Sequence, residues 1–142
     1  MKVRDVMSRG VQTARAADTI QQVARRMSEL DTGFMPICEG DRVLGLLTDR
    51  DIAIRAVAEG LGPETLATKI MTSGAESAAE DDDVDEVTTK MARLQIRRIV
   101  ILDKAGKLAG VMSLGDVALE AKAKDAGRTL AEISEPGDRP AH

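Results

Sequence analysis

The sequence has almost no aromatic side chains. Its 142 residues include no tryptophan, no tyrosine and a single phenylalanine, Phe34. Proteins that bind single-stranded nucleic acid stack its bases on aromatic rings, and aromatic cages hold quaternary ammonium ligands. The composition therefore excludes both kinds of site.

Cysteine and histidine, which often act as nucleophiles, bases and metal ligands, occur once each. Cys38 cannot form an internal disulfide, and its place in the apolar segment FMPIC favours a buried thiol over a reactive one. His142 is the last residue and has no companion ligand. Because the sequence also has no P-loop and no nucleophile beside a base, we expect neither enzymatic activity nor a bound metal.

The chain also lacks long apolar runs and an excess of positive charge. Its net charge is -4, with both signs spread along the sequence, so no basic stripe is available for nucleic acid. No apolar stretch approaches the roughly 20 residues that span a bilayer, and the amino terminus MKVRDVMSRG has no apolar segment typical of a signal peptide. We therefore expect a cytoplasmic protein without a nucleic-acid or membrane partner.

An internal repeat is present instead. An offset of 64 residues carries residues 6–8 onto residues 70–72. The same offset relates two apolar stripes that have the i, i+3, i+7, i+10 spacing of one helix face. The stripes consist of Ile20, Val23, Met27 and Leu30, and of Val84, Val87, Met91 and Leu94. Each half is therefore predicted to contain the same amphipathic helix, with Asp18 and Asp83 as capping residues.

Two strand-like segments follow each predicted helix. They are FMPIC and RVLGLLT in the first half, and RIVIL and KLAGVMS in the second, with turn-rich residues between them. The second turn is one residue longer, so the offset becomes 65 and carries Gly45 onto Gly110. A short helix is predicted after each second strand.

The order of elements predicts the fold class and the domain boundaries. Each half has the order helix, strand, strand, helix, so we expect a mixed α/β (α+β) fold with a small sheet flanked by helices in each of two repeats. The repeats are expected to pack about a pseudo-twofold axis. The expected boundaries are repeat 1 at 1–60, a linker at 61–65, repeat 2 at 66–124 and a C-terminal tail at 125–142.

Each second strand ends in a hydroxyl residue with an aspartate three positions later. The pairs are Thr48 with Asp51 and Ser113 with Asp116. A carboxylate in the first turn of a helix can accept hydrogen bonds from both hydroxyls of a ribose, and a nearby hydroxyl can donate to a phosphate oxygen. The same spacing is also that of an ordinary N-terminal helix cap, so the sequence leaves both interpretations open.

These motifs resemble those of the cystathionine beta-synthase (CBS) domain, present here as a tandem pair, or Bateman module. The resemblance rests on RDVMS with TKIMT, on MPIC with IVIL, and on GLLTDRDI with GVMSLGDV. It extends to about Lys124. The longer segment GLLTDRDIAIRAVAEGLGP is similar to small stand-alone bacterial members of the family.

The resemblance implies a regulatory module that binds an adenosine-containing nucleotide in the cleft between the repeats. The choice among AMP, ADP, ATP, a dinucleotide and S-adenosylmethionine stays open, because all of them contain adenosine. In ligand-binding members of the family the aspartate holds ribose, a role that falls on Asp51 and Asp116 here. The hydroxyl residue helps to hold phosphate, which assigns that role to Thr48 and Ser113.

Phosphate also requires cations, and here the two halves differ. The segment QIRRIV places Arg97 and Arg98 just before the inner strand of the second half, where nucleotide-binding relatives often carry basic residues. The first half has TGFMPI there, so phosphate would depend on Arg97, Arg98 or Arg50. The alternative is that the arginine pair is solvated charge at a sheet edge.

The inner strands provide the candidates for contact with adenine. Apolar strand residues enclose the base in ligand-binding relatives, and Met35 and Val100 are the candidates by position. Apolar residues of strands are, however, more often simply part of the core.

Two functions stay open: a nucleotide sensor, and a scaffold that has kept the fold but binds no nucleotide. The resemblance implies a homodimer of two modules in either case, and a regulated protein partner stays unidentified. The acidic run EDDD at 80–83 is interpreted as helix capping rather than as a metal site. We expect no cofactor other than a regulatory adenine nucleotide.

Overall fold

The computed structural model describes residues 1–133, with side chains described through Lys124. The chain divides into two compact units. The first unit comprises Gly10–Glu76 with Lys104–Leu108, and the second comprises Met1–Arg9, Ser77–Asp103 and the described chain from Ala109 onward. Each unit combines helices with a small sheet, which confirms the predicted mixed α/β class.

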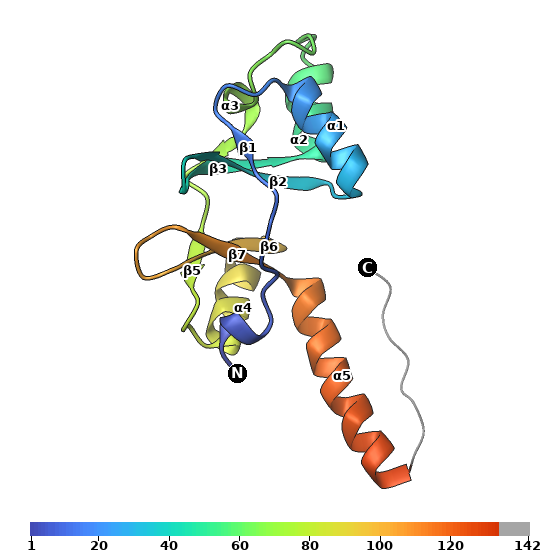
Figure 1. Cartoon of the computed structure of the whole chain (residues 1–142). Coiled ribbons are helices and arrows are strands. Elements are labelled where there is room, and N and C mark those ends of the chain that lie inside the picture. Colours follow the sequence, from blue (N-terminus) through green and yellow to red (C-terminus); the bar gives the residue numbers. More distant parts are fainter. Residues whose placement is uncertain (134–142) are drawn as a thin grey trace. The chain divides into compact units, whose positions relative to one another are not determined.

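The first unit has a four-stranded sheet in the order β1 (Ala14–Arg15), β2 (Phe34–Glu39), β3 (Arg42–Thr48) and β4 (Thr72–Ser73). Strand β1 runs parallel to β2, and the other neighbouring strands pair antiparallel. The helical segments are α1 (Ile20–Leu30), α2 (Asp49–Asp51), the π-helix η2 (Ile52–Val57) and α3 (Ala67–Ile70). Figure 1 shows α1, α2 and α3 on one side of this sheet.

The core of the first unit forms where these helices cover the sheet. Successive side chains of a strand point to opposite faces, so Met35 and Ile37 of β2 share one face. Both are fully buried, together with Leu47 of β3. They form one apolar cluster with the first three residues of the α1 stripe, with Ala56 of η2 and with Ile70 of α3.

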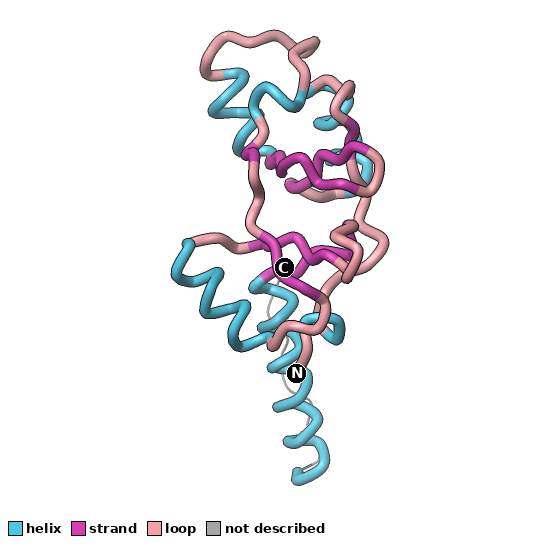
Figure 2. Tube along the Cα trace, turned by 90° about the vertical axis from the view of Figure 1, so that its left-hand side faces the viewer, coloured by secondary structure: helices cyan, strands magenta, loops and turns pink. Residues whose placement is uncertain are grey.

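The second unit repeats this arrangement with different lengths. Its three-stranded sheet has the order β5 (Ser77–Ala79), β6 (Arg98–Leu102) and β7 (Leu108–Ser113). Its helices are the 3-10 helix η1 (Val3–Asp5), α4 (Val84–Leu94) and α5 (Leu114–Ile133). The core joins Ile99 and Met112 from the sheet to Val3 and to the first three residues of the α4 stripe. In Figure 2 the helices of each unit lie on one side of its strands.

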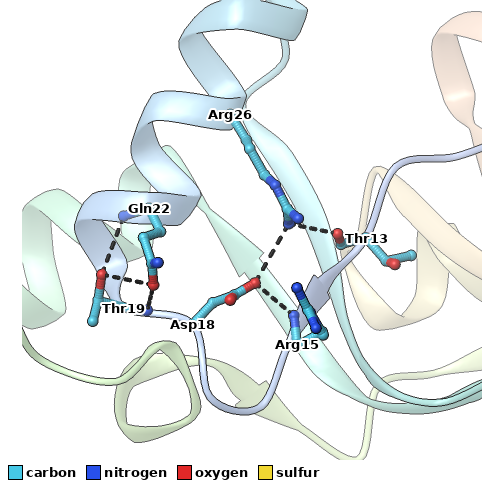
Figure 3. Close-up of polar contacts among 6 residues, drawn as sticks. All are labelled: Thr13, Arg15, Asp18, Thr19, Gln22 and Arg26. Atoms are coloured by element: carbon cyan, nitrogen blue, oxygen red, sulfur yellow. Dashed lines mark hydrogen bonds and ion pairs between the residues drawn. The ribbon is translucent and has the colours of Figure 1, made fainter.

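Helix α1 begins one residue later than predicted, because Thr19 and not Asp18 is its N-cap. Thr19 Oγ1 accepts a hydrogen bond from Gln22 N at 3.2 Å, and Gln22 Oε1 accepts one from Thr19 N at 2.8 Å (Figure 3). The prediction for Asp83 is confirmed, since its Oδ2 accepts from Glu86 N at 3.3 Å. The offset of 64 relates Asp83 to Thr19, so alignment of the two halves already indicates Thr19 as the N-cap of α1.

Asp18 closes the turn that precedes α1. Its Oδ2 accepts hydrogen bonds from Arg15 N at 2.8 Å and from Arg26 Nη1 at 3.4 Å (Figure 3). In the second unit, Asp82 Oδ2 accepts from Ala79 N at 2.9 Å. The same hydrogen bond therefore closes the equivalent turn in both units, which extends the repeat beyond the apolar stripes.

The last position of each apolar stripe is not part of a core. Leu30 and Leu94 are 46% and 37% exposed. Each lies in the final turn of its helix, directly before a residue with left-handed backbone, Asp31 with φ 53° and Gln95 with φ 57°. The chain leaves the helix direction at these residues, and the last apolar side chain of each stripe stays exposed.

The sequence pattern predicted a short helix after the second strand of repeat 2, and this prediction is wrong. Helix α5 contains 20 residues and continues through Ile133, so it includes the first part of the predicted C-terminal tail. The remainder of that tail, residues 134–142 with His142, lies outside the described residues.

The first residues of each predicted repeat pair with a strand from the other repeat. In the second unit, Ser8 exchanges two backbone hydrogen bonds with Val111, at 2.8 and 3.1 Å. In the first unit, β4 pairs with β3 at the equivalent position, Thr72 opposite Leu46. The predicted repeat boundaries follow sequence similarity and stay a prediction, whereas the compact units follow contacts.

The glycine shared by both second strands permits this close pairing. A Cβ atom added to Gly45 would lie 2.5 Å from the carbonyl oxygen of Thr72. A Cβ atom on Gly110 would overlap the carbonyl oxygen of Ser8. Any larger residue would therefore have to displace backbone rather than a flexible side chain.

We predict that Gly110→Ala lowers the free energy of unfolding by about 1–3 kcal/mol, the usual cost of overpacking a well-packed site. Gly115→Ala is the matched control, because its added Cβ would lie 3.6 Å from Ser113 Oγ, an ordinary contact distance. The control should keep or slightly raise stability. Urea unfolding measures the free energy of unfolding of both variants. If Gly110→Ala were as stable as the parent, the close approach of the Ser8 carbonyl oxygen to Gly110 would be contradicted.

Candidate ligand-binding turns

The strand-to-helix turn of the first unit is closed by two reciprocal hydrogen bonds. Thr48 Oγ1 accepts from Asp51 N at 3.0 Å, and Asp51 Oδ2 accepts from Thr48 N at 3.0 Å. Thr48 has extended backbone at the end of β3, which allows its side chain to reach the first turn of α2. The pair is therefore a complete capping box.

The turn of the second unit has the same construction. Ser113 Oγ accepts from Asp116 N at 3.0 Å, and Asp116 Oδ2 accepts from Ser113 N at 3.2 Å. The structure thus brings each predicted pair together and gives all four side chains a capping role. Their predicted roles toward ribose and phosphate stay predictions.

The two aspartates differ in the residue four positions further on. Asp51 Oδ1 lies 3.8 Å from Arg55 Nε. The offset of 65 carries Arg55 onto Glu120, so Asp116 has an acidic residue at the equivalent position. Arg55 therefore partly offsets the negative charge of Asp51, whereas Glu120, at the equivalent position, cannot offset that of Asp116.

A backbone hydrogen bond fixes the residue before each inner strand beside the turn. In the second unit Leu114 N donates to Arg97 O at 3.0 Å, and in the first unit Asp49 N donates to Gly33 O at 2.9 Å. Arg97 and Arg98 are exposed where β6 begins. The second unit therefore has two arginines next to its turn, and the first unit has a glycine at the position of Arg97.

The remaining candidate residues lie in different environments. Arg50 is exposed on α2, and its backbone N donates to Asp49 Oδ1 at 2.8 Å. Met35 is 0% exposed and belongs to the core of the first unit. Val100 is 1% exposed and lies on the opposite face of β6 from Ile99. The core role that the sequence left open is observed for Met35, and contact with adenine stays a prediction for both residues.

A pocket of about 380 Å³ opens beside the turn of the first unit. Its lining includes Met27, Asp31, Thr32, Gly33, Asp49 and Ile52. A Cβ atom on Gly33 would lie 2.6 Å from Asp49 Oδ2, so the glycine provides the space in which this carboxylate lies. Asp31 and Asp49 were not among the predicted site residues, although their equivalents in the second half, Gln95 and Leu114, carry no charge.

The single cysteine has no features of a reactive group. Burial raises the pKa of the Cys38 thiol, and the negative charge of Asp41 raises this pKa further. The side chain is 4% exposed. A buried thiol that stays protonated at neutral pH is a poor nucleophile, in agreement with the prediction that Cys38 has no catalytic role.

The acidic run at 80–83 supports local structure. Asp83 caps α4, Asp82 closes the preceding turn, and Asp81 forms an ion pair with Arg4. Among the side chains described, which extend through Lys124, no three histidine, cysteine, aspartate or glutamate residues are grouped as metal ligands would be. No helix among the described residues is both long and apolar enough to cross a membrane.

Comparison with known proteins matches both halves of the sequence to one family. The family model of the CBS domain matches residues 3–57 and 67–122. The CBS domain-containing protein YhcV of Bacillus subtilis is 35% identical over 133 residues, which cover 93% of this chain and 94% of YhcV.

Solved structures share the fold. Hypoxic Response Protein I, whose crystal structure contains two coordinated zinc ions, is 32% identical, with a TM-score of 0.75 over 83% of this chain and 97% of that chain. The CBS domain protein PAE2072 from Pyrobaculum aerophilum, solved in complex with AMP, is 26% identical, with a TM-score of 0.78 over 90% of this chain and 99% of that chain.

We predict that Ser113→Ala lowers the free energy of unfolding by about 0.5–2 kcal/mol without any ligand, because Asp116 N loses its acceptor at the helix start. Ser113→Thr keeps a hydroxyl acceptor and should stay close to the parent. Chemical denaturation of the three chains tests the capping role. An alanine variant as stable as the parent would show that the capping box contributes little.

Proposed function

Because the chain belongs to the CBS domain family, we propose that it is a regulatory module that binds an adenosine-containing nucleotide and has no catalytic activity. The observation that carries the proposal is the duplicated turn, in which Thr48 with Asp51 and Ser113 with Asp116 present a hydroxyl and a carboxylate at equivalent strand-to-helix junctions. The AMP complex of PAE2072 supports this choice of ligand class.

In the proposed complex the two aspartates accept hydrogen bonds from ribose hydroxyls. An ionised carboxylate has about four acceptor positions, so one capping bond to Oδ2 leaves capacity for a diol. Bonds to a charged acceptor are stronger than neutral ones. Asp116 is the stronger candidate, because Asp51 is already paired with Arg55.

Phosphate binding is proposed for the second unit. The Ser113 hydroxyl accepts the capping bond and still has its hydrogen to donate to a phosphate oxygen. Arg97 and Arg98 add positive charge beside the same turn, and guanidinium groups match phosphate oxygens well. Thr48 and Arg50 are the corresponding groups of the first unit.

A CBS scaffold that binds no nucleotide is the second candidate function. One observation favours it: the hydroxyl and the carboxylate of each turn already pair with backbone N–H groups in a complete capping box. In either case we propose a cytoplasmic homodimer that acts on an unidentified protein partner. A ligand that binds only the folded chain raises the unfolding temperature, so a thermal shift with AMP favours the sensor.

We predict that Asp116→Asn separates the capping role from the ligand role. The amide oxygen can still accept from Ser113 N, so the unfolding midpoint without ligand should stay close to that of the parent. Loss of charge-assisted hydrogen bonds to ribose should lower the affinity for AMP at least about tenfold, which calorimetric titration measures.

Asp51→Asn is the matched variant of the first unit, and we expect it to have the smaller effect on AMP. If both variants bound AMP as tightly as the parent, the carboxylates would be structural and the scaffold would replace the sensor as the proposed function.

We also predict that replacing Arg97 and Arg98 together by alanine weakens the binding of AMP much more than that of adenosine, because the guanidinium groups contact only the phosphate. The control is Arg25→Ala with Arg93→Ala, two exposed arginines of α1 and α4 that give the same change in net charge. Competition calorimetry with both ligands measures the difference. Equal losses for AMP and adenosine would contradict the phosphate role.

A further inference from the structure

A connector covers the start of α1 in the first unit. It comprises residues 61–63 and follows Gly60, whose φ of 75° lets the chain turn back after η2. Leu61 N donates a hydrogen bond to Ala56 O at 2.9 Å, and Pro63 O accepts one from Gln21 N at 3.3 Å. The Leu61 side chain is partly buried and packs against the apolar cluster of the unit. The connector is therefore bonded both to η2 and to the first turn of α1.

The second unit has no equivalent of this connector among its described residues. In the first unit Ile20 N donates to Thr65 O at 2.8 Å, two residues after the connector. In the second unit Val84 N donates to Met1 O at 2.9 Å, and the offset of 64 relates both partners to those of the first bond. Met1 therefore stands where Thr65 does, and the repeat matches no residue of the sequence to the connector.

Helix α5 also does not turn back where η2 does. The offset of 65 carries Gly60 onto position 125, and α5 continues past this position through Ile133 (Figure 1). A pocket of about 280 Å³ lies between α5, the start of α4 and the amino-terminal segment. Its lining includes Met1, Val84, Asp85, Val117, Glu120 and Ala121. The elements that correspond to those holding the connector thus border an open pocket in the second unit.

The burial of equivalent residues places this pocket at the position of the connector. The connector bonds to Gln21 and Ala56. Their counterparts by the offsets of 64 and 65, Asp85 and Ala121, both line the pocket. Because η2 is a π-helix and α5 is an α-helix, position 56 falls between 120 and 121. Ala56 is fully buried, whereas Glu120 is half-buried and Ala121 is exposed. The surface that the connector covers in the first unit is therefore open in the second.

The pocket offers apolar surface rather than a net charge. The charged groups of its lining residues are two carboxylates, one lysine side chain and the chain's amino terminus, so their charges balance. Asp85 N, the counterpart of Gln21 N, already donates to Asp83 Oδ2 at 3.1 Å. A segment in this pocket would therefore be held chiefly by an aliphatic side chain, as Leu61 is held in the first unit. The apolar lining side chains are those of Met1, Val6, Val84, Val117 and Ala121.

The sequence beyond the described residues does not provide such a side chain. Residues 134–142, SEPGDRPAH, include no leucine, isoleucine, valine, methionine or phenylalanine. The connector of a second copy is already bonded within its own first unit. We infer that the pocket docks a segment of another protein with the chemistry of the connector: an aliphatic side chain followed by glycine and proline. This inference goes beyond the proposed function and does not depend on nucleotide binding.

A synthetic peptide with the connector sequence is the probe. Fluorescence anisotropy of dye-labelled AEGLGPET, the sequence of residues 58–65, measures its binding to the full chain. We expect saturable binding. Replacement of the peptide's leucine by alanine should weaken binding at least about tenfold, because most of the apolar area that the pocket buries is lost.

Ala121→Leu tests where the peptide binds. The larger side chain fills the pocket from α5, so the affinity for the peptide should fall at least about tenfold. The unfolding midpoint should stay the same or rise, because the new side chain covers apolar surface. Ala123→Leu is the matched control, since Ala123 is exposed on the same helix but does not line the pocket, and it should bind the peptide as the parent does.

Absence of saturable binding would overturn the inference, as would equal affinity of the peptide for Ala121→Leu and the parent. A parent dimer that dissociates in Ala121→Leu, measured by sedimentation equilibrium, would overturn it by assigning the pocket to a second copy. Displacement of the labelled peptide by a peptide of residues 134–142 would overturn it by assigning the pocket to the chain's own tail. Each of these outcomes leaves the proposed function standing, because titration with AMP tests that function separately.

Discussion

The reciprocal hydrogen bonds between a hydroxyl and a carboxylate at the end of each second strand determine the geometry on which the candidate sites depend. They hold the last strand residue, Thr48 or Ser113, against the first helical turn. The same bonds fix the aspartate, and a separate backbone hydrogen bond holds the residue before the inner strand beside the turn. A cap and a binding group are therefore not exclusive alternatives, because a capped carboxylate keeps acceptor capacity for a ligand.

The two units have kept this frame while their charges have diverged. Both retain the motif glycine at which the segment from the opposite half of the sequence pairs, and both close the turn before the long helix with an aspartate. The side chains around the two strand-to-helix turns differ, with Asp49 and Arg55 in the first unit and Leu114 and Glu120 in the second. Duplication accounts for the shared backbone.

Much of this fold could be predicted from the sequence, because apolar periodicity and turn residues are local signals. Helices α1 and α4 and the four main strands lie where the patterns indicate, although α1 begins one residue later than predicted. The short strands β1, β4 and β5 could not be predicted, since two or three residues have no period and form only because a distant strand offers hydrogen bonds. The length of α5 was missed because its sequence has no strong apolar stripe, and the pocket was missed because its lining comes from separate segments.

The central claim is that this CBS pair binds adenosine nucleotides specifically. Native mass spectrometry of the full chain with AMP, and with GMP as a matched competitor of the same charge, tests it most directly. We expect saturable AMP adducts that GMP does not displace, because the proposed site encloses the base as well as the ribose and phosphate. Absence of AMP adducts, or equal binding of AMP and GMP, would contradict the claim.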